Sequence, residues 1–405
     1  MASSRQKKRA LSLSLLLAAL LLGGCAGFSS SSARQTGPEQ AQTETERFPA
    51  QRADPLRQDA AGIKDRWENP DVKESRMQLA EEQKAKIEAL GRSGRAEIYL
   101  AAGCFWGAEA YFKQVPGVLE TEVGYANGEG EQVGYRDIPR TGHAETVQIL
   151  YDPYKVKLAE LLERYYRVID PLSLNRQGND QGVQYRTGIY YTDEDSGALA
   201  RYSLEILAER LEEQPCIECE PLRNFTPAED YHQDYLDKHP GGYCHIPLGR
   251  VRDILFEGEE QADDAELCQS LDAQTFAITR RKGTERPGSS PLDQTFQPGI
   301  YVDVLTGQPL FSSDDKYDAG CGWPSFTMPI TTDAAVYQDD RSHGMIRTEV
   351  DSMAGNHLGH VFDDGPRESG SLRYCINGAA LRFIPREEME AAGYLALLPF
   401  VRADE

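Results

Sequence analysis

Apolar and polar positions alternate over short distances from about residue 95 onward, and the pattern predicts a mixed α and β domain. Apolar runs of strand length are separated by segments whose apolar residues recur with helical spacing. We expect strands at 97–102, 146–150 and 187–191, and helices at 105–114, 158–168 and 194–211. This mixture of elements predicts an α plus β fold for the first half of the chain.

A further helix is expected near residue 226. Thr226-Pro227-Ala228-Glu229 has the pattern of a capping box with proline at the first helical position. The helix should run through Tyr231 and Tyr235 and end before the His239-Pro240-Gly241-Gly242 segment.

The second half has a different pattern. Short apolar runs at 300–305, 345–350 and 381–384 alternate with turns rich in Gly, Pro and Asp, which predicts a mostly β domain. An acidic segment at 251–271 separates the two halves, and we interpret it as the domain junction.

The first 25 residues have the pattern of an export signal. Basic residues at 5–9 precede an apolar run at 11–22 that is too short to span a bilayer comfortably. Leu22-Gly23-Gly24-Cys25 resembles the bacterial lipoprotein signal, in which the cysteine takes a lipid, and Ala26 carries no inner-membrane retention signal. An ordinary signal peptide with an incidental cysteine is the alternative. We expect a lipid anchor at Cys25 and a protein on the periplasmic side of the cell envelope, at the outer membrane.

Polar segments follow the predicted signal. Residues 28–60 are rich in Ser, Gln, Thr and Pro and predict a disordered tether, and residues 74–90 predict a solvated helix. The expected organisation is a signal peptide at 1–24, a lipidated and tethered segment at 25–94, a first domain at 95–250, an acidic linker at 251–271 and a second domain at 272–405.

Length and charge agree with two soluble domains. The chain has 405 residues, more than one hydrophobic core usually serves. Its formal net charge of −22 argues against a nucleic-acid partner, because phosphate contacts require clustered Lys and Arg.

Cys104 is placed between the strand predicted at 97–102 and the helix predicted at 105–114. A thiol at a helix N-terminus is expected to have a lowered pKa, which favours the nucleophilic thiolate. Taken alone, a Gly-Cys-aromatic-aromatic-Gly segment is equally compatible with a packed strand end.

The segments around Cys104 resemble the type A methionine sulfoxide reductases over roughly residues 97–248. The resemblance rests on five segments in order: Gly103-Cys104-Phe105-Trp106-Gly107, Tyr135 with Gly142-His143-Ala144-Glu145, residues 179–186, residues 228–233, and Gly242-Tyr243-Cys244-His245. It implies a two-layer α+β domain with a ferredoxin-like core that reduces the S epimer of methionine sulfoxide.

The resemblance also implies the roles of individual residues. Cys104 would attack the sulfoxide sulfur, and Glu145 would protonate the oxygen, with a pKa that burial raises towards neutrality. Cys244 would resolve the resulting sulfenic acid as a disulfide. The remaining implied site residues are Tyr135 and Tyr185 as hydroxyl donors, Asp180 as an organiser of polar groups, and Phe105 and Trp106 around the S-methyl group.

Cys216 and Cys219 form a Cys-x-x-Cys pair with no role in this family known to us. The pair either forms a structural bridge or relays a disulfide outward, and we favour the bridge. A zinc site is not favoured because a second pair is missing from the segment.

The second half resembles the type B methionine sulfoxide reductases over about residues 272–394. The matching segments are Gly283-Thr284-Glu285, residues 320–326, residues 342–345, residues 357–362 and Arg373-Tyr374-Cys375-Ile376-Asn377. The resemblance implies a mostly β domain, a β-tent or distorted barrel, that reduces the R epimer.

By position in these motifs, Cys375 is the expected nucleophile and Cys321 the resolving thiol. His357 and His360 would polarise and protonate the sulfoxide oxygen, which requires a neighbouring charge to raise the histidine pKa. The other implied site residues are Asn377 and Arg373, which would order the site, and Trp323, which would cover the methyl group.

Metal binding by His357 and His360 is a competing interpretation, but the sequence offers nothing in order to complete a tetrahedral set. Many type B proteins hold a structural zinc on two Cys-x-x-Cys pairs. Here the corresponding places hold Thr306-Gly307-Gln308-Pro309 and Ser352-Met353-Ala354-Gly355, so we expect no zinc. The sequence also departs from the family at residues 286–290, and Cys268 has no assignable role.

Together the two resemblances imply a multifunctional oxidoreductase that reduces both epimers in oxidised proteins or peptides and repairs envelope proteins after oxidative stress. No cofactor is expected. A thioredoxin-like protein would reduce the two redox-active disulfides. The alternatives are an electron-transferring thiol lipoprotein, which accounts for cysteine pairs but not for Glu145 or His357, and an envelope scaffold, which accounts for the N-terminus alone.

Overall fold

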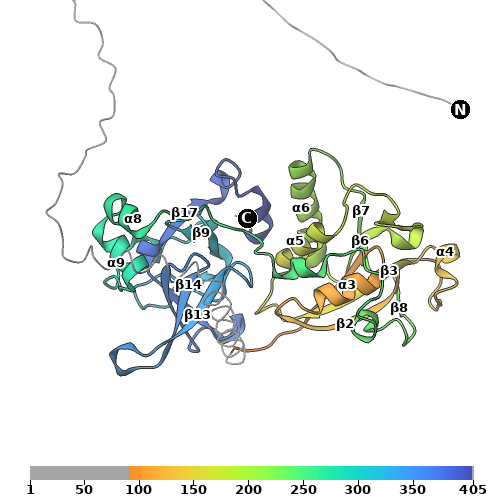
Figure 1. Ribbon diagram of the computed structural model, residues 1–405, viewed down its shortest axis with the longest axis horizontal. Coiled ribbons are helices and arrows are strands. Elements are labelled where there is room, and N and C mark those ends of the chain that lie inside the picture. The colour runs from red at the N-terminus through yellow and green to blue at the C-terminus, as the bar shows by residue number, and fades with distance from the viewer. Residues whose placement is uncertain (1–90, 404–405) are drawn as a thin grey trace, which may run out of the picture. The chain divides into compact units, whose positions relative to one another are not determined.

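The computed structural model describes residues 91–403 (Figure 1). The predicted signal peptide, Cys25, the tether and the helix expected at 74–90 lie outside the described residues. Within residues 91–403, none of the helices combines the length and the apolar character needed to cross a membrane.

The first domain is built on a βαββαβ unit. Its strands have the order β6-β1-β3-β2 and every neighbouring pair among them is antiparallel, which is the arrangement of a ferredoxin-like core. The predicted fold class is confirmed. The elements are β1 Ala96–Ala102, α3 Phe105–Phe112, β2 Val118–Ala126, β3 Ala144–Tyr151, α5 Leu158–Val168 and β6 Thr187–Tyr191.

Additional elements extend this unit. Strand β7 (Ile217–Pro221) pairs parallel to β6, and β8 (Phe225–Pro227) pairs antiparallel to β2, so the sheet has six strands. The other elements of this domain are α4 Ile138–Thr141, β4 Arg176–Gln177, β5 Asp180–Gln181, α6 Glu194–Leu211 and α7 Tyr235–Lys238.

Successive side chains of β1 point to opposite faces of the sheet and pack into two different apolar clusters. Ile98 and Leu100 belong to the large core that also contains apolar residues of α3 and α5, whereas Tyr99 and Ala101 belong to a smaller cluster on the other face. Helices therefore pack on one face of the sheet, and this core fixes the position of α3.

The helix predicted from residue 226 is wrong. Thr226 lies in β8, and its hydroxyl donates to the carbonyl of Glu131 instead of capping a helix. Glu229 accepts hydrogen bonds from the Tyr125 hydroxyl and the Tyr135 backbone N–H, so its carboxylate is not free to close a capping box. Only the single turn α7 is helical in this region.

The second domain is mostly β, as predicted. One sheet has the order β10-β9-β17 and the other has the order β11-β12-β16-β15-β14-β13, and all pairs are antiparallel. Helices α8 (Asp264–Ser270) and α9 (Ala273–Arg281) precede them. The strands are β9 Gly299–Asp303, β10 Pro309–Ser312, β11 Lys316–Tyr317, β12 Ser325–Phe326, β13 Ala335–Asp340, β14 Arg347–Ser352, β15 His357–Phe362, β16 Arg373–Ile376 and β17 Leu381–Pro385.

The acidic segment at 251–271 contacts both domains: the carbonyls of Val251 and Ile254 accept from Arg164 and Arg167 of α5, and residues 255–261 contact the second domain. The backbone N–H of Leu255 donates to Asp333, that of Glu259 donates to the carbonyl of Thr306, and the Gln261 side chain accepts from Asn356. These contacts, together with α8, make the junction a packed part of the structure.

Candidate active sites

Cys104 lies at the junction of β1 and α3, as the sequence predicts. It is the N-cap of α3 and is 6% exposed. Gly103 has φ +81°, and a Cβ at this position would lie 2.4 Å from the Cβ of Gln177, so glycine is required for the turn. The tight turn aims the Cys104 side chain at the end of the helix.

Glu145 is placed next to Cys104 by β3. Its side chain is 2% exposed, and its Oε2 atom accepts a hydrogen bond from the Phe105 backbone N–H at 3.2 Å. Burial raises the pKa of Glu145 to about 8, although that hydrogen bond opposes the rise. The group therefore holds a proton at neutral pH, as the implied role of acid requires.

The expected lowering of the Cys104 pKa is not found. Burial raises the pKa of the thiol above its usual range, the charge of Glu145 adds to the rise, and the hydrogen bond from the Trp106 backbone only partly offsets them. The helix N-terminus lowers the pKa of Cys104 by less than desolvation raises it, so the resting thiol is protonated.

The other predicted polar residues of this site are brought together. Burial raises the pKa of Tyr185, and the charge of Glu145 and a hydrogen bond with Tyr135 raise it further, so Tyr185 interacts with both residues. The charge of Asp180 raises the pKa values of Cys104 and Glu145. Its Oδ2 atom is buried without a hydrogen-bond partner among the described residues, so it can accept from a bound substrate.

The two predicted aromatic residues differ in exposure. Phe105 is 1% exposed and belongs to the core, whereas Trp106 is partly exposed and stacks on Tyr235 with ring centroids 3.7 Å apart. Trp106 also donates its indole N–H to His232 at 3.1 Å. His232 is buried and lies 5.0 Å from the ring of Tyr135, so it supports both side chains. The sequence motif contained His232, but only the contacts reveal this role.

Cys244 lies against the first turn of α3. A Cβ built on Gly107 would lie 2.8 Å from the Cys244 sulfur, and the thiol donates to the carbonyl of Ile246 at 3.1 Å. Gly107 is three residues after Cys104 on the same helix turn. The missing side chain of Gly107 therefore leaves the space that lets the predicted resolving thiol lie beside the helix end.

Cys216 and Cys219 are both free thiols. Cys219 is paired with Ile189 within β7, and the strand begins at Ile217. The structural bridge favoured from the sequence is therefore not formed in this structure.

The predicted second site brings two thiols into contact. Cys321 and Cys375 lie with their sulfur atoms 3.9 Å apart, and the Cys321 sulfur is 3.4 Å from the Ser325 hydroxyl. Burial raises the pKa of Cys375 to about 12, Cys321 adds to the rise, and Arg373 partly offsets it. A short movement is enough to join the two sulfur atoms as a disulfide.

Three neighbouring strands place a row of polar side chains beside Cys375. Cys375 in β16 is directly opposite His360 in β15, and His360 is directly opposite Glu349 in β14. Directly opposed residues on neighbouring strands point to the same face of a sheet. The histidine predicted to act with Cys375 is therefore its immediate neighbour.

The two predicted histidines have opposite electrostatic environments. Burial lowers the pKa of His357, but ion pairs with Asp351 and Glu349 outweigh it and the net shift is upward. The pKa of His360 is lowered by burial, with only partial compensation from Asp340. The expectation that neighbouring charge raises the pKa holds for His357 and is wrong for His360.

Asp340 fixes the tautomer of His360. Hydrogen bonds from Ser342, His360 and Arg347 outweigh burial and keep the pKa of Asp340 below its usual range. Its carboxylate lies 2.8 Å from His360 Nε2 and can only accept. His360 Nε2 therefore carries a proton, which leaves Nδ1 of the neutral ring as an acceptor.

The remaining predicted residues of the second site form hydrogen bonds with neighbouring backbone groups and side chains. Asn377 accepts from the Glu285 backbone at 3.0 Å and donates to the Leu358 carbonyl at 2.9 Å. Arg373 makes a two-point contact with Asp364, and Trp323 donates to the Glu285 carbonyl at 3.3 Å. These side chains fix the loops around Cys375.

Glu285 holds this network together and was not assigned a role from the sequence. Its carboxylate accepts from the backbone N–H groups of Gly378 and Ala379, at 2.6 and 3.0 Å, just after the Cys375 strand. Its position in the Gly283-Thr284-Glu285 motif was the available signal.

The two loops at the places of the family's zinc ligands contain no thiol or imidazole. Gln308 joins them instead. Its side-chain oxygen accepts from the Met353 backbone at 3.1 Å, and its amide nitrogen donates to the Ala334 carbonyl at 3.1 Å. The donor set does not suit a zinc ion, and the hydrogen bond from Met353 to Gln308 connects the two loops.

Two family models match the chain. Residues 96–263 match the model described as peptide methionine sulfoxide reductase, and residues 271–385 match the model described as SelR domain. The two matches follow each other without overlap, and one contains Cys104 while the other contains Cys375.

Solved structures similar to the first domain include two proteins. Mxr1 from Saccharomyces cerevisiae in reduced form is 34% identical, with 39% of this chain and 94% of that chain covered and a TM-score of 0.36. Methionine sulfoxide reductase A of Corynebacterium diphtheriae is 35% identical, with 39% of this chain and 85% of that chain covered and a TM-score of 0.35.

Proposed function

Because the chain belongs to the methionine sulfoxide reductases, with a peptide methionine sulfoxide reductase domain followed by a SelR domain, we propose that Cys104 and Cys375 are its two attacking thiols. The first domain reduces the S epimer of methionine sulfoxide and the second reduces the R epimer. The observation that carries the assignment of the thiols is the 3.9 Å contact between Cys375 and Cys321, together with the place of Cys104 beside Glu145.

Each site runs the same sequence of bond changes. The attacking sulfur takes the sulfoxide oxygen, methionine is released, and the cysteine becomes a sulfenic acid. The resolving thiol, Cys244 or Cys321, then attacks that sulfur, and water leaves as the disulfide forms. An external dithiol supplies two electrons and two protons to restore the thiols.

The acid–base groups differ between the sites. At Cys104, Glu145 gives the proton to the sulfoxide oxygen, with Tyr135 and Tyr185 as further donors and Asp180 ordering the pocket. At Cys375, His357 is the proton donor to the oxygen, and His360, whose Nε2–H is bound to Asp340, lies directly opposite Cys375. Supporting residues are Asn377, Arg373 and Trp323 at the second site, and Phe105 and Trp106 at the first.

Separate epimers test the assignment. The soluble form is incubated with the S or the R epimer of a methionine sulfoxide and dithiothreitol, and the methionine formed is quantified. We expect Cys104→Ser to abolish S-epimer turnover only and Cys375→Ser to abolish R-epimer turnover only. Loss of both activities in either variant would show one shared site and would overturn the assignment.

A thioredoxin-like protein of the envelope is the proposed reductant. Each predicted disulfide joins two cysteines of the same domain, so an external dithiol is needed to reduce it. Thioredoxin with its reductase should replace dithiothreitol for both epimers. Failure with every dithiol protein tried, while dithiothreitol still works, would contradict this part of the proposal.

We also propose that the second domain folds without zinc. The support is the pair of loops joined through Gln308, which offers an amide in place of thiolates. Metal analysis of purified protein should find no stoichiometric zinc, and one zinc per chain would contradict it.

A lipid at Cys25 is proposed to anchor the protein on the periplasmic side of the outer membrane, where oxidised envelope proteins are the substrates. The support is the Leu22-Gly23-Gly24-Cys25 sequence after an apolar run. Fractionation should place the wild type in the membrane and Cys25→Ser in the soluble periplasmic fraction. An unchanged membrane fraction for the variant would contradict the anchor. Nucleic acid is not a proposed partner, because the net charge is −22.

A further inference from the structure

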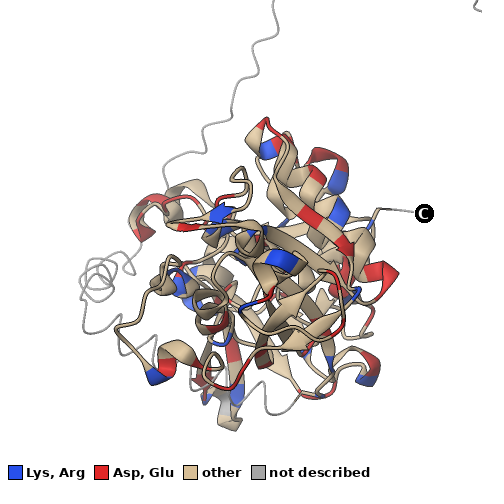
Figure 2. Cartoon of the chain, turned by 90° about the vertical axis from the view of Figure 1, so that its right-hand side faces the viewer, with Lys and Arg blue, Asp and Glu red and all other residues tan. Residues whose placement is uncertain are grey.

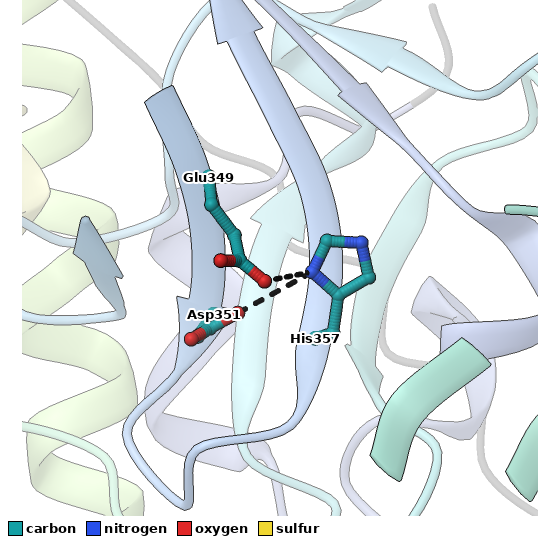
Figure 3. A group of neighbouring side chains, drawn as sticks. All are labelled: Glu349, Asp351 and His357. Atoms are coloured by element: carbon teal, nitrogen blue, oxygen red, sulfur yellow. Dashed lines mark ion pairs between the residues drawn. The ribbon is translucent and has the colours of Figure 1, made fainter. Parts of the chain in front are cut away.

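Two carboxylates that the proposed mechanism does not use converge on His357. Glu349 and Asp351 come from β14 and His357 from the neighbouring strand β15 (Figure 3). The carboxylate of Glu349 lies 2.6 Å from His357 Nδ1, and that of Asp351 lies 3.5 Å from the same atom. The exposed fractions of the three residues are 4%, 3% and 2%. The cluster is buried and focused on one ring nitrogen.

A bulge in the β14–β15 pairing creates this arrangement. Val350 is opposite Gly359, but Asp351 is opposite His357, so the register skips Leu358. The skipped residue turns His357 towards the face that carries His360, and the two imidazole rings have centroids 5.5 Å apart. The bulge therefore brings both histidines to the Cys375 side of the sheet.

The second ring nitrogen of His357 is unused. Both ring nitrogens are buried and neither has hydrogen-bond geometry with a partner among the described residues, but Nδ1 forms ion pairs with the two carboxylates, whereas none is found for Nε2. Figure 3 shows this nitrogen pointing away from both carboxylates. A buried N–H without an acceptor is costly, so the geometry favours an acceptor supplied by a ligand. The oxygen of a sulfoxide is a strong acceptor and fits this requirement.

We propose that Glu349 and Asp351 are positioning residues of the R-epimer site, which hold His357 as an imidazolium with its Nε2–H directed at the sulfoxide oxygen. The inference rests on the proposed function of Cys375. Neither carboxylate touches the substrate. They act through His357, which keeps a positive charge beside the oxygen while sulfur is attacked.

Charge compensation agrees with a proton on His357. Lys282 lies 2.7 Å from the other oxygen of Glu349, so Lys282 and a charged His357 are the cations beside the two buried carboxylates, of which burial raises the pKa of Asp351. Two unpaired carboxylates at this depth would be strongly unfavourable. The pKa of Glu349 falls to about 2, because the contacts with His357 and Lys282 outweigh burial.

Other titratable and charged groups also surround this face. They are His360 on the same strand, Asp340 and Arg347 on the β13–β14 hairpin, Cys375 and Arg373 on β16, and Lys282 after α9. Arg347 and Asp340 form an ion pair at 2.6 Å. The positive charge of His357 is therefore stabilised mainly by Glu349 and Asp351.

A divalent cation is the competing occupant. Single ligand atoms of Glu349, Asp351 and His357 lie within 4.8 Å of one another. Lys282 already supplies positive charge to Glu349, and a cation would have to displace the proton from His357 Nδ1. The proton is therefore favoured, and the experiment includes metal binding as an overturning outcome.

The variants Glu349→Gln and Asp351→Asn, alone and together, test the proposal in the full chain. The rates for the R and S epimers are measured from pH 5.5 to 9.5. Removal of the carboxylates lowers the pKa of His357, so the fall of R-epimer kcat with rising pH should move to lower pH by about one unit or more. At pH 8 the R-epimer kcat should drop at least about tenfold, with a smaller change in KM.

Two controls separate positioning from folding. The S-epimer rate of the same chains should stay within about twofold of wild type. Asp303→Asn removes another fully buried carboxylate of this domain, one that binds Asn356 and the Leu305 backbone. This variant is expected to change thermal stability but not the R-epimer pH profile. An identical shift in Asp303→Asn would assign the effect to general destabilisation and overturn the proposal.

Histidine NMR provides a readout that does not depend on activity. With 15N-labelled histidine, the wild type should show His357 charged at pH 7, and the double variant should show it neutral. A neutral His357 in the wild type overturns the proposal. So does stoichiometric Zn²⁺ or Mn²⁺ that is lost in Glu349→Gln. If the wild type does not turn over the R epimer, the proposed function fails, while the NMR titration still decides the charge of His357.

Discussion

At the scale of single residues, burial determines the protonation states of both Glu145 and Cys104. Burial raises the pKa of both groups, to about 8 for Glu145 and above the usual range for the thiol. At neutral pH the resting site therefore holds a carboxylic acid beside a protonated thiol. Nucleophilic attack then requires that substrate binding changes this balance, since the thiolate is the reactive form.

Glu145→Gln tests the acid at this site. Because the folded-state pKa is raised to about 8, the acid form is present below pH 8 and is lost as the pH rises through that value. Wild-type S-epimer turnover should fall above about pH 8. The variant should lose roughly 10²- to 10⁴-fold in kcat and no longer show this fall. Initial rates for both epimers across pH provide the measurement.

The R-epimer rate of the Glu145→Gln protein is the matched control and should equal that of wild type. If the variant kept full S-epimer activity, Tyr135 or Tyr185 would have to be the proton donor. The sequence suggested the raised pKa of Glu145 correctly, but the Cys104 pKa went the other way because desolvation at a 6% exposed thiol cannot be read from a motif.

At the scale of elements, the Gln308 side chain connects two loops of the second domain. The loop before β10 and the loop after β14 are joined by its side chain, which is 2% exposed and uses both amide atoms. Thr306 supports the same turn by accepting from the Gln308 backbone. Hydrogen bonds thus tie two β-hairpin ends together.

Gln308→Ala should lower the free energy of unfolding by about 1–3 kcal/mol, because the buried Ala334 carbonyl and the partly buried Met353 N–H lose their partner. Thermal denaturation and urea titration followed by circular dichroism give the value. Gln294→Ala, at an exposed position whose amide contacts only the neighbouring Asp293, is the control and should change stability by less than about 0.5 kcal/mol. Equal effects of the two changes would show that the loops are held by other contacts.

Elements with strong local periodicity could be predicted from the sequence. The helix expected at 158–168, the helix expected at 194–211 and the strand expected at 187–191 agree with α5, α6 and β6 residue by residue. The helix expected from Thr226 failed because Glu229 binds Tyr125, which is about a hundred residues away in sequence. Local patterns do not contain such distant partners.

The same limit applies to the candidate sites. Motifs identified Cys375, His357 and His360, but the register that sets Glu349 opposite His360 depends on strand pairing. The bulge that turns His357 towards them is likewise a property of two paired strands. For this reason Glu349, Asp351 and Glu285 had no assigned role until the contacts were known.

Charge is distributed rather than concentrated at the scale of the described structure. Figure 2 shows acidic and basic segments interspersed on the face turned to the viewer. Protein and peptide substrates, rather than polyanions, are compatible with this distribution.

A buried polar network joins residues of the two domains. Arg164 in α5 contacts Glu160 at 2.9 Å and Asp333 at 3.2 Å, and the Thr332 backbone donates to Glu160 at 2.9 Å. Arg164 is 1% exposed and Glu160 is fully buried. Lys157 and Asp315 form a further ion pair between the domains. An apolar cluster that includes Ala159 and Ile300 lies in the same region.

Arg164→Met should separate the unfolding of the two domains. Removing the guanidinium leaves the buried Glu160 without its cation, which costs about 3–5 kcal/mol at such depth. Calorimetry of the wild type should show one transition with parallel loss of both epimer activities, and the variant should show two. Arg95→Met, which breaks an exposed ion pair with Glu120, is the control and should leave one transition at nearly the same temperature. Two transitions already present in the wild type would mean that the Glu160–Arg164–Asp333 contacts do not couple the domains.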